Sequence, residues 1–349
     1  MKNKYLILPV ILLTLFLFNL SACSKAAAKN VSSQSQTIAS KQTAQADTKI
    51  ASSAKNTADN IAVSPAAEAN QGDNIIIPTQ TPEEEKKEEA KAQDDIINDD
   101  GRLTHPWYYA PQITNYQGKT PKWFGETLKF KIGWSFVTAG EAILSTPKIV
   151  NIENQPAFQV EAQAKSYAVI DKIFKVRDIN VSWVAADLKR SLGYWQSVRE
   201  GKYARDEWLT FDYKTHTFIN HKQDRHGNIE TQPAASFKGN EIFDILSALY
   251  FVRSQELPLK GEVYFDIVNR TKQYPLKVIV HGKETVKVKA GKFDCILVEP
   301  LFSGEGIFVS KGKSLKVWLT DDEYKMPVRM SVEVMVGSVY GELVEYTRK

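Results

Sequence analysis

The stretch ETLKFKIGWSF, residues 126–136, alternates apolar side chains with mostly polar ones. Its apolar members stand at every second position: Leu128, Phe130, Ile132, Trp134 and Phe136. Successive side chains of a β-strand point to opposite faces of the sheet, so a period of two is typical of a strand with one buried face. The stretch therefore predicts a half-buried strand.

Runs with the same period continue to the C-terminal end of the chain. They are INVSWVA, DEWLTFDY, EVYFDIV, LKVIVHG, FDCILVEP, SLKVWLT, VRMSVEVMV and YGELVEY. Gly, Asn, Asp or Pro stand in many of the short segments between them. Antiparallel strands can be joined by tight turns, whereas parallel strands need long crossovers. We therefore expect a mainly β fold built from an antiparallel sheet.

Two stretches instead show helical spacing. SYAVIDKIF, residues 166–174, would form about two turns. NEIFDILSALYFVR, residues 240–253, predicts a longer helix with Asn240 as its N-cap. The apolar stripe of this longer helix comprises Ile242, Ile245, Leu246 and Leu249. We expect such a stripe to be buried against the sheet.

The first residues have the features of an exported lipoprotein. A short basic start and an apolar run too short for a membrane span lead into Leu-Ser-Ala-Cys, residues 20–23. This sequence resembles a bacterial lipobox, at which the signal peptide is removed and the cysteine is acylated, for example with palmitate. We therefore expect a signal peptide over residues 1–22 and a lipid-anchored Cys23. An ordinary secretory signal with an incidental cysteine is the alternative.

The residues after Cys23 predict its destination and a tether. Ser24 is not the aspartate of an inner-membrane retention signal, so we expect the periplasmic side of the cell envelope, anchored to the outer membrane. No Phe, Tyr or Trp occurs between Ser24 and Pro106, and such a segment buries too little apolar area to fold alone. Residues 23–100 are expected to be a disordered tether rich in Ala, Ser, Thr, Lys and Glu. Residues 101–349 are expected to form a single antiparallel β domain.

Four segments of this expected domain resemble one known family. They are GETLKFKIGWSFVTAGEAIL, FDILSALYFVRSQELPLKGE, VKAGKFDCILVEP and GIFVSKGKSLKVWLTDDEYKMPVRMSV. In this order they resemble the bacterial envelope family known as domain of unknown function 3108, over residues 123–349. The resemblance implies a secreted domain with a strongly curved antiparallel sheet, a half-barrel or open barrel-like form, and one or two short packed helices. It carries over no catalytic residues.

Motifs for nucleotide binding and catalysis are not supported. GIFVSKGKS invites comparison with a P-loop, but five residues separate Gly306 from Gly312 where that motif needs four. The following LKVWL predicts a strand, whereas a phosphate cradle needs a helix N-terminus. The chain has no Gly-x-Ser-x-Gly motif. We expect no catalytic residue and no cofactor.

Histidines and acidic residues offer two weak metal hypotheses. His216, His221 and His226 recur every five residues, a spacing that sends neighbours on a strand to opposite faces. Exposed hairpin histidines are the preferred interpretation, with a metal shared through hairpin folding as the alternative. The acidic run of residues 321–323, Asp-Asp-Glu, favours a solvated turn over an acid pair or a cation site. We therefore predict no metal site.

Cysteine content and charge limit the remaining possibilities. Acylation of Cys23 leaves Cys295 without a disulfide partner, and its strand-like surroundings favour a buried side chain over a reactive thiol. The chain has 45 Lys and Arg against 41 Asp and Glu, without a basic helix or run. We therefore expect no nucleic acid partner. The positive balance is compatible with anionic lipid or an envelope polymer.

These observations favour a non-enzymatic, lipid-anchored envelope protein that binds a lipid, an amphiphile or an envelope polymer on a curved, aromatic-rich sheet. The expected partners are the membrane, through acylated Cys23, and that ligand. Candidate ligand-binding residues on the concave face are Trp134, Trp183, Trp195, Trp208 and Trp318. Aromatic core packing is the alternative for each of them. An envelope hydrolase and a structural component of an envelope assembly are the alternative functions.

Overall fold

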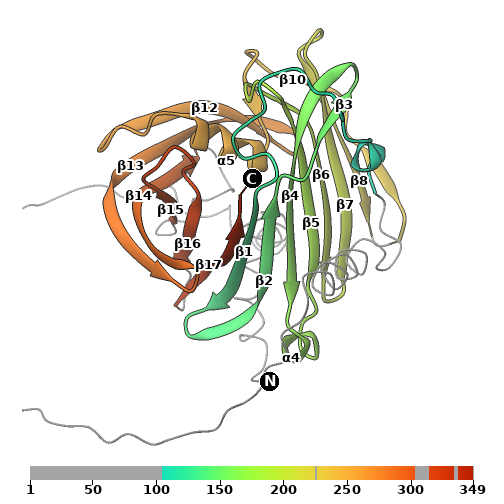
Figure 1. Ribbon diagram of the computed structural model, residues 1–349. Helices are drawn as coiled ribbons and strands as arrows, with labels where there is room; N and C mark the ends of the chain where they lie inside the picture. The colour runs from blue at the N-terminus through green and yellow to red at the C-terminus, as the bar shows by residue number, and fades with distance from the viewer. Residues whose placement is uncertain (1–103, 225, 303–313, 334–336, 349) are drawn as a thin grey trace, which may run out of the picture. The chain divides into compact units, whose positions relative to one another are not determined.

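The computed structural model describes residues 104–224, 226–302, 314–333 and 337–348 (Figure 1). The expected signal peptide, Cys23 and the tether lie outside the described residues. Within these residues, no helix is both long and apolar enough to cross a membrane.

The described residues form 17 strands and three short helical segments. The strands are β1 (Thr127–Trp134), β2 (Val137–Ser145), β3 (Ile149–Ile152), β4 (Gln155–Ser166), β5 (Arg177–Ala185), β6 (Ser191–Glu200), β7 (Tyr203–Asp212), β8 (Thr217–Asp224), β9 (Ile229–Thr231), β10 (Ala235–Ser236), β11 (Ile242–Phe243), β12 (Glu262–Asn269), β13 (Lys272–Val288), β14 (Gly291–Phe302), β15 (Leu315–Thr320), β16 (Pro327–Glu333) and β17 (Ser338–Thr347). The helical segments are the 3₁₀ helix η1 (Pro106–Tyr109) and the α-helices α4 (Ala168–Asp171) and α5 (Ile245–Ser254).

All the strands belong to one sheet. From edge to edge its order is β9, β8, β7, β6, β5, β4, β2, β1, β17, β16, β15, β14, β13, β12 and β11. β3 lies beside β2 on the edge of β4, and β10 lies beside β9 on the edge of β8. Every pair is antiparallel except β11 with β12, and no described strand pair joins the two edges. The mainly β, antiparallel, open barrel-like fold is confirmed.

Irregularities in the strand pairing accompany the curvature visible in Figure 1. Register shifts occur at Ile132/Gly133, Trp183/Val184 and Val280/Gly282. Such bulges bend a strand and increase its twist. Beyond the third shift, the end of the β13–β14 hairpin reaches β17, where the amide of Ala290 donates to the carbonyl of Leu343 at 3.2 Å. The long hairpin therefore folds back onto the sheet.

The alternating stretch that predicted the first strand forms β1. Leu128, Phe130 and Ile132 are buried, as expected. Phe136 is not, since its side chain is 94% exposed. The strand ends at Trp134 and Ser135 adopts φ 51°, so the chain turns before the alternation reaches Phe136. The prediction was wrong at this last position.

The N-terminal boundary of the long helix also differs from the prediction. Asp244, not Asn240, is the N-cap of α5: its Oδ1 accepts from the amides of Leu246 and Ser247. The preceding Ile242 and Phe243 form β11 instead of the first helical turn. Aspartate is a favoured N-cap, and the apolar pair before it is buried as a strand beside β12.

The other predicted helix is shorter than expected. Residues 166–174 contain only the four-residue α4, Ala168–Asp171. Ser166 still belongs to β4, where it pairs with Gly140 of β2. Because the strand extends into the stretch, its helical spacing forms about one turn.

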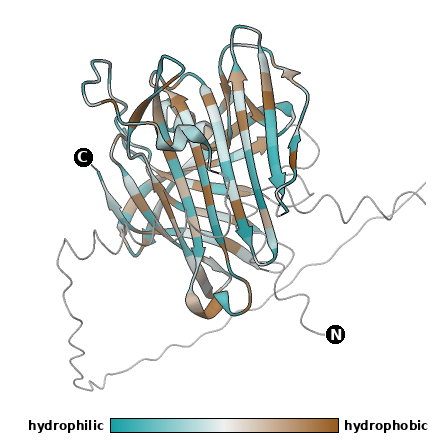
Figure 2. Cartoon of the chain, turned by 90° about the vertical axis from the view of Figure 1, so that its right-hand side faces the viewer, coloured by the Kyte–Doolittle hydropathy of each residue, from teal (hydrophilic) through white to brown (hydrophobic). Residues whose placement is uncertain are grey.

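Strands β4, β5 and β6 are buried on both faces. Ser182 of β5 faces α5 and donates to Asp244 at 2.5 Å. The opposite face is covered by η1, whose Tyr108 packs on Trp195 with ring centroids 5.6 Å apart. Figure 2 shows the resulting bands of hydrophobic and hydrophilic residues along the strands of this half of the sheet. An N-terminal segment thus seals a face that would otherwise be exposed.

Candidate functional site

An apolar cavity lies between α5 and the inner face of the sheet. It has a volume of about 130 Å³, and every lining residue is apolar. α5 contributes Ile245, Leu246, Ala248, Leu249 and Val252, and strands β1, β2 and β12 to β16 supply the rest. Polar side chains are absent from this lining because α5 presents its apolar stripe here and most of the lining strand residues face inward.

A buried carboxylate fixes the N-terminal end of α5 beside this cavity. Oδ2 of Asp244 accepts from Ser182 at 2.5 Å and from Ser191 at 2.6 Å, while Oδ1 caps the helix. The side chain of Ser247 accepts from the amide of Asp244 at 2.8 Å and completes a capping box. Burial raises the pKa of the Asp244 carboxyl, and these hydrogen bonds oppose the rise. The helix start is therefore tied to β5 and β6.

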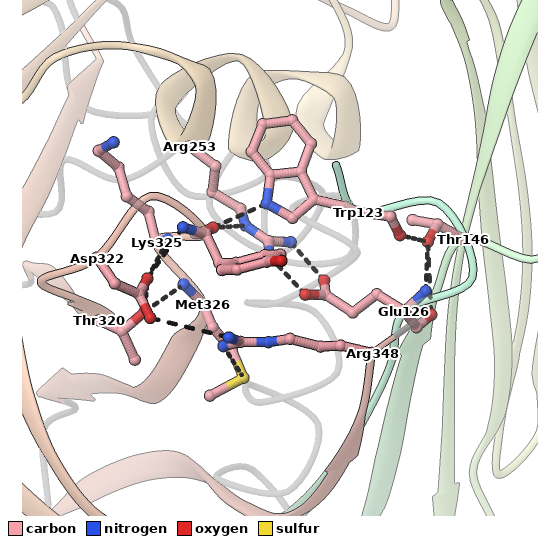
Figure 3. Close-up of polar contacts among 10 residues, drawn as sticks. Trp123, Glu126, Thr146, Arg253, Thr320, Asp322, Lys325, Met326 and Arg348 are labelled. Carbon is pink, nitrogen blue, oxygen red and sulfur yellow. Dashed lines mark hydrogen bonds and ion pairs between the residues drawn. The ribbon is translucent and has the colours of Figure 1, made fainter. Parts of the chain in front are cut away.

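A buried ion pair fixes the C-terminal end of α5 (Figure 3). Arg253 donates to both carboxylate oxygens of Glu126 at 2.7 and 2.8 Å, and its Nε donates to the carbonyl of Tyr324 at 3.2 Å. The guanidinium also lies over the ring of Trp123, 5.0 Å from its centroid. Both charged side chains are essentially inaccessible to solvent. An anion at the helix start and a cation at its end both complement the helix dipole.

A second, polar pocket of about 20 Å³ lies at the first turn of α5. Its lining includes Tyr194, Gln196, Glu207, Asn220, Asp244 and Arg270, and Ile245 lines both this polar pocket and the apolar cavity. Glu207 accepts from Gln196 at 2.9 Å and from Asn220 at 2.7 Å, and it pairs with Arg205 at 3.1 Å. Polar and apolar spaces thus adjoin at Ile245.

Three of the five tryptophans expected on the concave face lie on the opposite one. Trp183 and Trp195 are fully buried in the cluster under η1, and Trp208 packs against this cluster. Trp183 donates to Gln159 at 3.0 Å, and Trp208 stacks on His221 with centroids 5.1 Å apart. The placement was wrong because η1, which the sequence did not predict, covers the outer face of these strands.

Trp134 and Trp318 also lie outside the apolar cavity. Trp134, at the end of β1, is half-buried against the main core cluster. Trp318 of β15 donates to Glu284 at 2.9 Å, and Arg329 lies over its ring. None of the five tryptophans lines the apolar cavity. Their role in ligand binding stays a prediction, and the structure directs attention to aliphatic residues instead.

The residues considered for metal binding and redox chemistry are dispersed or buried. Among the described residues, no group of three His, Cys, Asp or Glu side chains could hold a metal ion. His221 contacts Thr231 at 2.9 Å, and Asp322 accepts from the amides of Tyr324 and Lys325 in an exposed turn. Most of GIFVSKGKS lies outside the described residues.

Cys295 is fully buried, as the sequence predicted. Burial raises the pKa of its thiol to about 12. Because the thiolate is the reactive form, this side chain acts as a small core residue.

Sequence reasoning missed the residues that position α5 and line the polar pocket. The spacing of Asp244 and Ser247 before an apolar run could have indicated a capping box. Glu126 and Arg253 are 127 residues apart, and a single sequence gives no signal for such a pair. Arg270 lies in a turn and resembles any surface arginine in sequence.

Similar folds occur among solved structures at low sequence identity. A β-barrel-like protein of domain of unknown function DUF1849 from Brucella abortus has 9% identity and a TM-score of 0.45, covering 66% of this chain and 99% of its own. A candidate exported protein with a YmcC-like fold from Bacteroides fragilis has 10% identity and a TM-score of 0.30, and the match covers 66% of this chain and 98% of that protein. A candidate lipoprotein from Parabacteroides distasonis has 12% identity and a TM-score of 0.27, and the match covers 65% of this chain and 97% of that protein.

Sequence comparison identifies the family. No curated protein matches the chain. The family model described as protein of unknown function (DUF3108) matches residues 129–344, which include most of β1 and most of β17. The matched span is more than half of the chain and contains both α5 and the strands that line the apolar cavity. The chain therefore belongs to the DUF3108 family.

Proposed function

We propose that this protein is a lipid-anchored component of the bacterial cell envelope that binds the apolar chain of a lipid or amphiphile without changing it chemically. The observation that carries the proposal is the apolar cavity between α5 and the sheet. No ionisable side chain lines it, so a bound chain meets no acid, base or nucleophile there. This favours binding over hydrolysis.

The size of the cavity sets the scale of the interaction. An apolar cavity of about 150 Å³ stays dry and accepts benzene. A cavity of about 130 Å³ therefore suits a chain end of roughly five carbons. At about 0.8 kcal/mol per buried methylene, such a segment would contribute on the order of 4 kcal/mol before the costs of association. Contacts beyond the cavity must supply the remaining affinity.

The test uses the mature chain, residues 23–349, with Cys23→Ser so that its own acyl groups are absent. An environment-sensitive apolar dye should bind, and dodecanol should displace it competitively. Leu249→Trp should abolish binding because the indole fills the cavity, whereas Leu249→Ala should retain it because the cavity grows. Both substitutions are expected to lower the stability of the fold, but only Leu249→Trp fills the cavity. A loss of binding in Leu249→Trp alone therefore reports loss of space and not loss of fold.

Two outcomes would contradict the proposal. The first is a folded parent protein that binds neither the dye nor dodecanol. The second is unchanged binding in a folded Leu249→Trp variant. Binding of an envelope polysaccharide in place of the dye would favour the polymer-binding alternative.

A further inference from the structure

The polar pocket beside the apolar cavity contains groups that the fold leaves without partners. Oδ1 of Asn220 and Nη2 of Arg270 are buried and accept or donate no hydrogen bond within the described residues. The amide orientation of Asn220 is fixed because its Nδ2 donates to Glu207, which can only accept. Its oxygen, in a side chain only 4% exposed, is therefore left as an acceptor in the polar pocket.

Charge in the polar pocket is unevenly compensated. Arg205 is paired with Glu207 at 3.1 Å, whereas no carboxylate of the described chain lies within ion-pair distance of Arg270. The oxygens of Asp244 are already engaged by Ser182, Ser191 and the helix start. Burial is the main cause that lowers the pKa of Arg270, the nearby Arg205 charge adds to it, and the charge of Glu207 opposes it only in part.

The backbone at Arg270 supports a role for its side chain. Arg270 occupies the first position of the two-residue turn between β12 and β13, with φ 58°. Glycine is favoured at such positions because a Cβ is strained there. Residues held in strained backbone regions concentrate at functional sites. A large cationic side chain at this position therefore calls for an explanation other than the turn itself.

We propose that the polar pocket receives the head group of the amphiphile whose chain fills the apolar cavity, and that this head group carries an oxyanion and a neighbouring hydroxyl. Arg270 would donate to the oxyanion, and Oδ1 of Asn220 would accept from the hydroxyl. Ile245 lines both spaces, so a ligand whose head and chain occupied them would pass this side chain. The enclosed volume of about 20 Å³ holds little more than one water-sized group, so only an oxygen of the head group would enter it fully. This favours a compact head group, and the proposed ligand class is a long-chain hydroxycarboxylate. This inference rests on the proposed function.

The experiment compares dodecanol, dodecanoate, 3-hydroxydodecanoate and dodecyl phosphate as competitors of the dye on the Cys23→Ser mature chain. We expect dodecanoate to bind at least about 10-fold more tightly than dodecanol, since a charge-assisted hydrogen bond is gained. The hydroxy acid should bind more tightly still. Arg270→Gly should remove the preference for the carboxylates and leave dodecanol binding and the fold intact.

The control is Lys260→Gly, which also replaces a basic residue of positive φ, 61°, but an exposed one that lines neither space. Both glycine variants should be as stable as the parent or more so, but only Arg270→Gly should change ligand preference. Equal affinities of dodecanol and the two carboxylates would overturn the head-group inference but not the proposed function. Water would then occupy the polar pocket. Absence of dodecanol and dye binding would instead overturn the proposed function. Tighter binding of dodecyl phosphate than of either acid would identify a phosphate head group and contradict the carboxylate assignment.

A second inference rests on an independent observation at one end of the sheet. The β1–β2 turn and α4 lie at this end (Figure 1). The amide of Tyr167, which precedes α4, donates to the carbonyl of Ala139 in β2 at 3.0 Å. The side chains of Phe136, Val169 and Ile173 are 94%, 73% and 65% exposed. These three residues are termed the apolar rim.

Basic residues accompany the apolar rim. Lys172 and Lys175 are exposed beside it, and the carbonyl of Lys175 accepts from Gly201 in the β6–β7 turn at 2.8 Å. Lys202 in that turn is also exposed. The interface of an anionic bilayer accepts apolar side chains and attracts cations. The apolar rim and the exposed lysines beside it are complementary to such a surface. We infer that the apolar rim docks on an anionic phospholipid surface.

The test is co-sedimentation of the Cys23→Ser mature chain with vesicles of phosphatidylcholine and phosphatidylglycerol, and with phosphatidylcholine alone. Binding should require phosphatidylglycerol, and Phe136→Ser with Ile173→Ser should weaken it by more than about 10-fold, because two apolar side chains are withdrawn from the bilayer. Tyr109→Ser is the control, since Tyr109 is 66% exposed but lies on η1. Absence of binding by the parent, or equal binding by the double variant, would overturn this inference.

Discussion

Arg253→Met tests whether the buried ion pair holds α5 against the sheet. Arg253 and Glu126 have side-chain exposures of 0% and 1%, and the pair is bidentate. Removing one partner of such a pair leaves the other charge buried and costs about 3–5 kcal/mol. For a folded unit of this size, that loss lowers Tm by roughly 6–20 °C.

Urea unfolding followed by tryptophan fluorescence measures the change, because the ring of Trp123 lies against the guanidinium. Arg253→Met combined with Glu126→Leu should be more stable than Arg253→Met alone, since no buried charge is left unpaired. The control is Arg329→Met, which removes a half-buried partner of Glu342 at 2.8 Å and should cost about 1 kcal/mol or less. A loss below about 1 kcal/mol for Arg253→Met, or a double variant that loses the sum of both single changes, would refute the reasoning.

Three further predictions concern the anchor, the tether and the η1 cluster. Cys23→Ser should abolish fatty-acid labelling and lipoprotein-specific cleavage, and a variant that is labelled and processed like the parent would rule out the lipobox. Limited proteolysis of the mature chain should cut between Ser24 and about residue 105 and leave a resistant core, whereas protection of that span would contradict the tether. Burial, and then the charge of His221, lowers the pKa of His105 from 6.5 to about 4, so stability should be lost as pH falls between these values, by at most about 3 kcal/mol. His105→Gln should remove this part of the acid sensitivity in pH-dependent urea melts, and an unchanged pH profile would contradict it.

The curved sheet could be predicted because its signal is local. Alternation over Leu128, Phe130 and Ile132 is a property of consecutive residues, and the structure follows it until the chain turns at Ser135. The start of α5 could not be read in the same way. The apolar residues of β11 continue the helical spacing, and only their pairing with β12 separates them from the helix.

The candidate site was less accessible to sequence reasoning than the fold. Aliphatic residues such as Leu249 and Val252 line a cavity only because the sheet leaves space opposite them, and their spacing is also that of an ordinary core helix. Tryptophans drew attention because they are large, yet Trp183 and Trp195 are covered by a segment that begins more than 70 residues earlier. Which segment covers each face of a doubly buried strand depends on the entire topology.

The way α5 is attached explains how a cavity can persist beneath it. A helix held by apolar contacts alone would settle against the sheet until the space closed, because interiors pack densely. Here Asp244 fixes one end of the helix to β5 and β6, and Arg253 fixes the other end to Glu126, which lies just before β1. Both attachments are directional and buried, so moving the helix inward would break hydrogen bonds that water cannot replace. The polar ends therefore set the distance between helix and sheet, and the apolar middle of the helix is left with room for a chain.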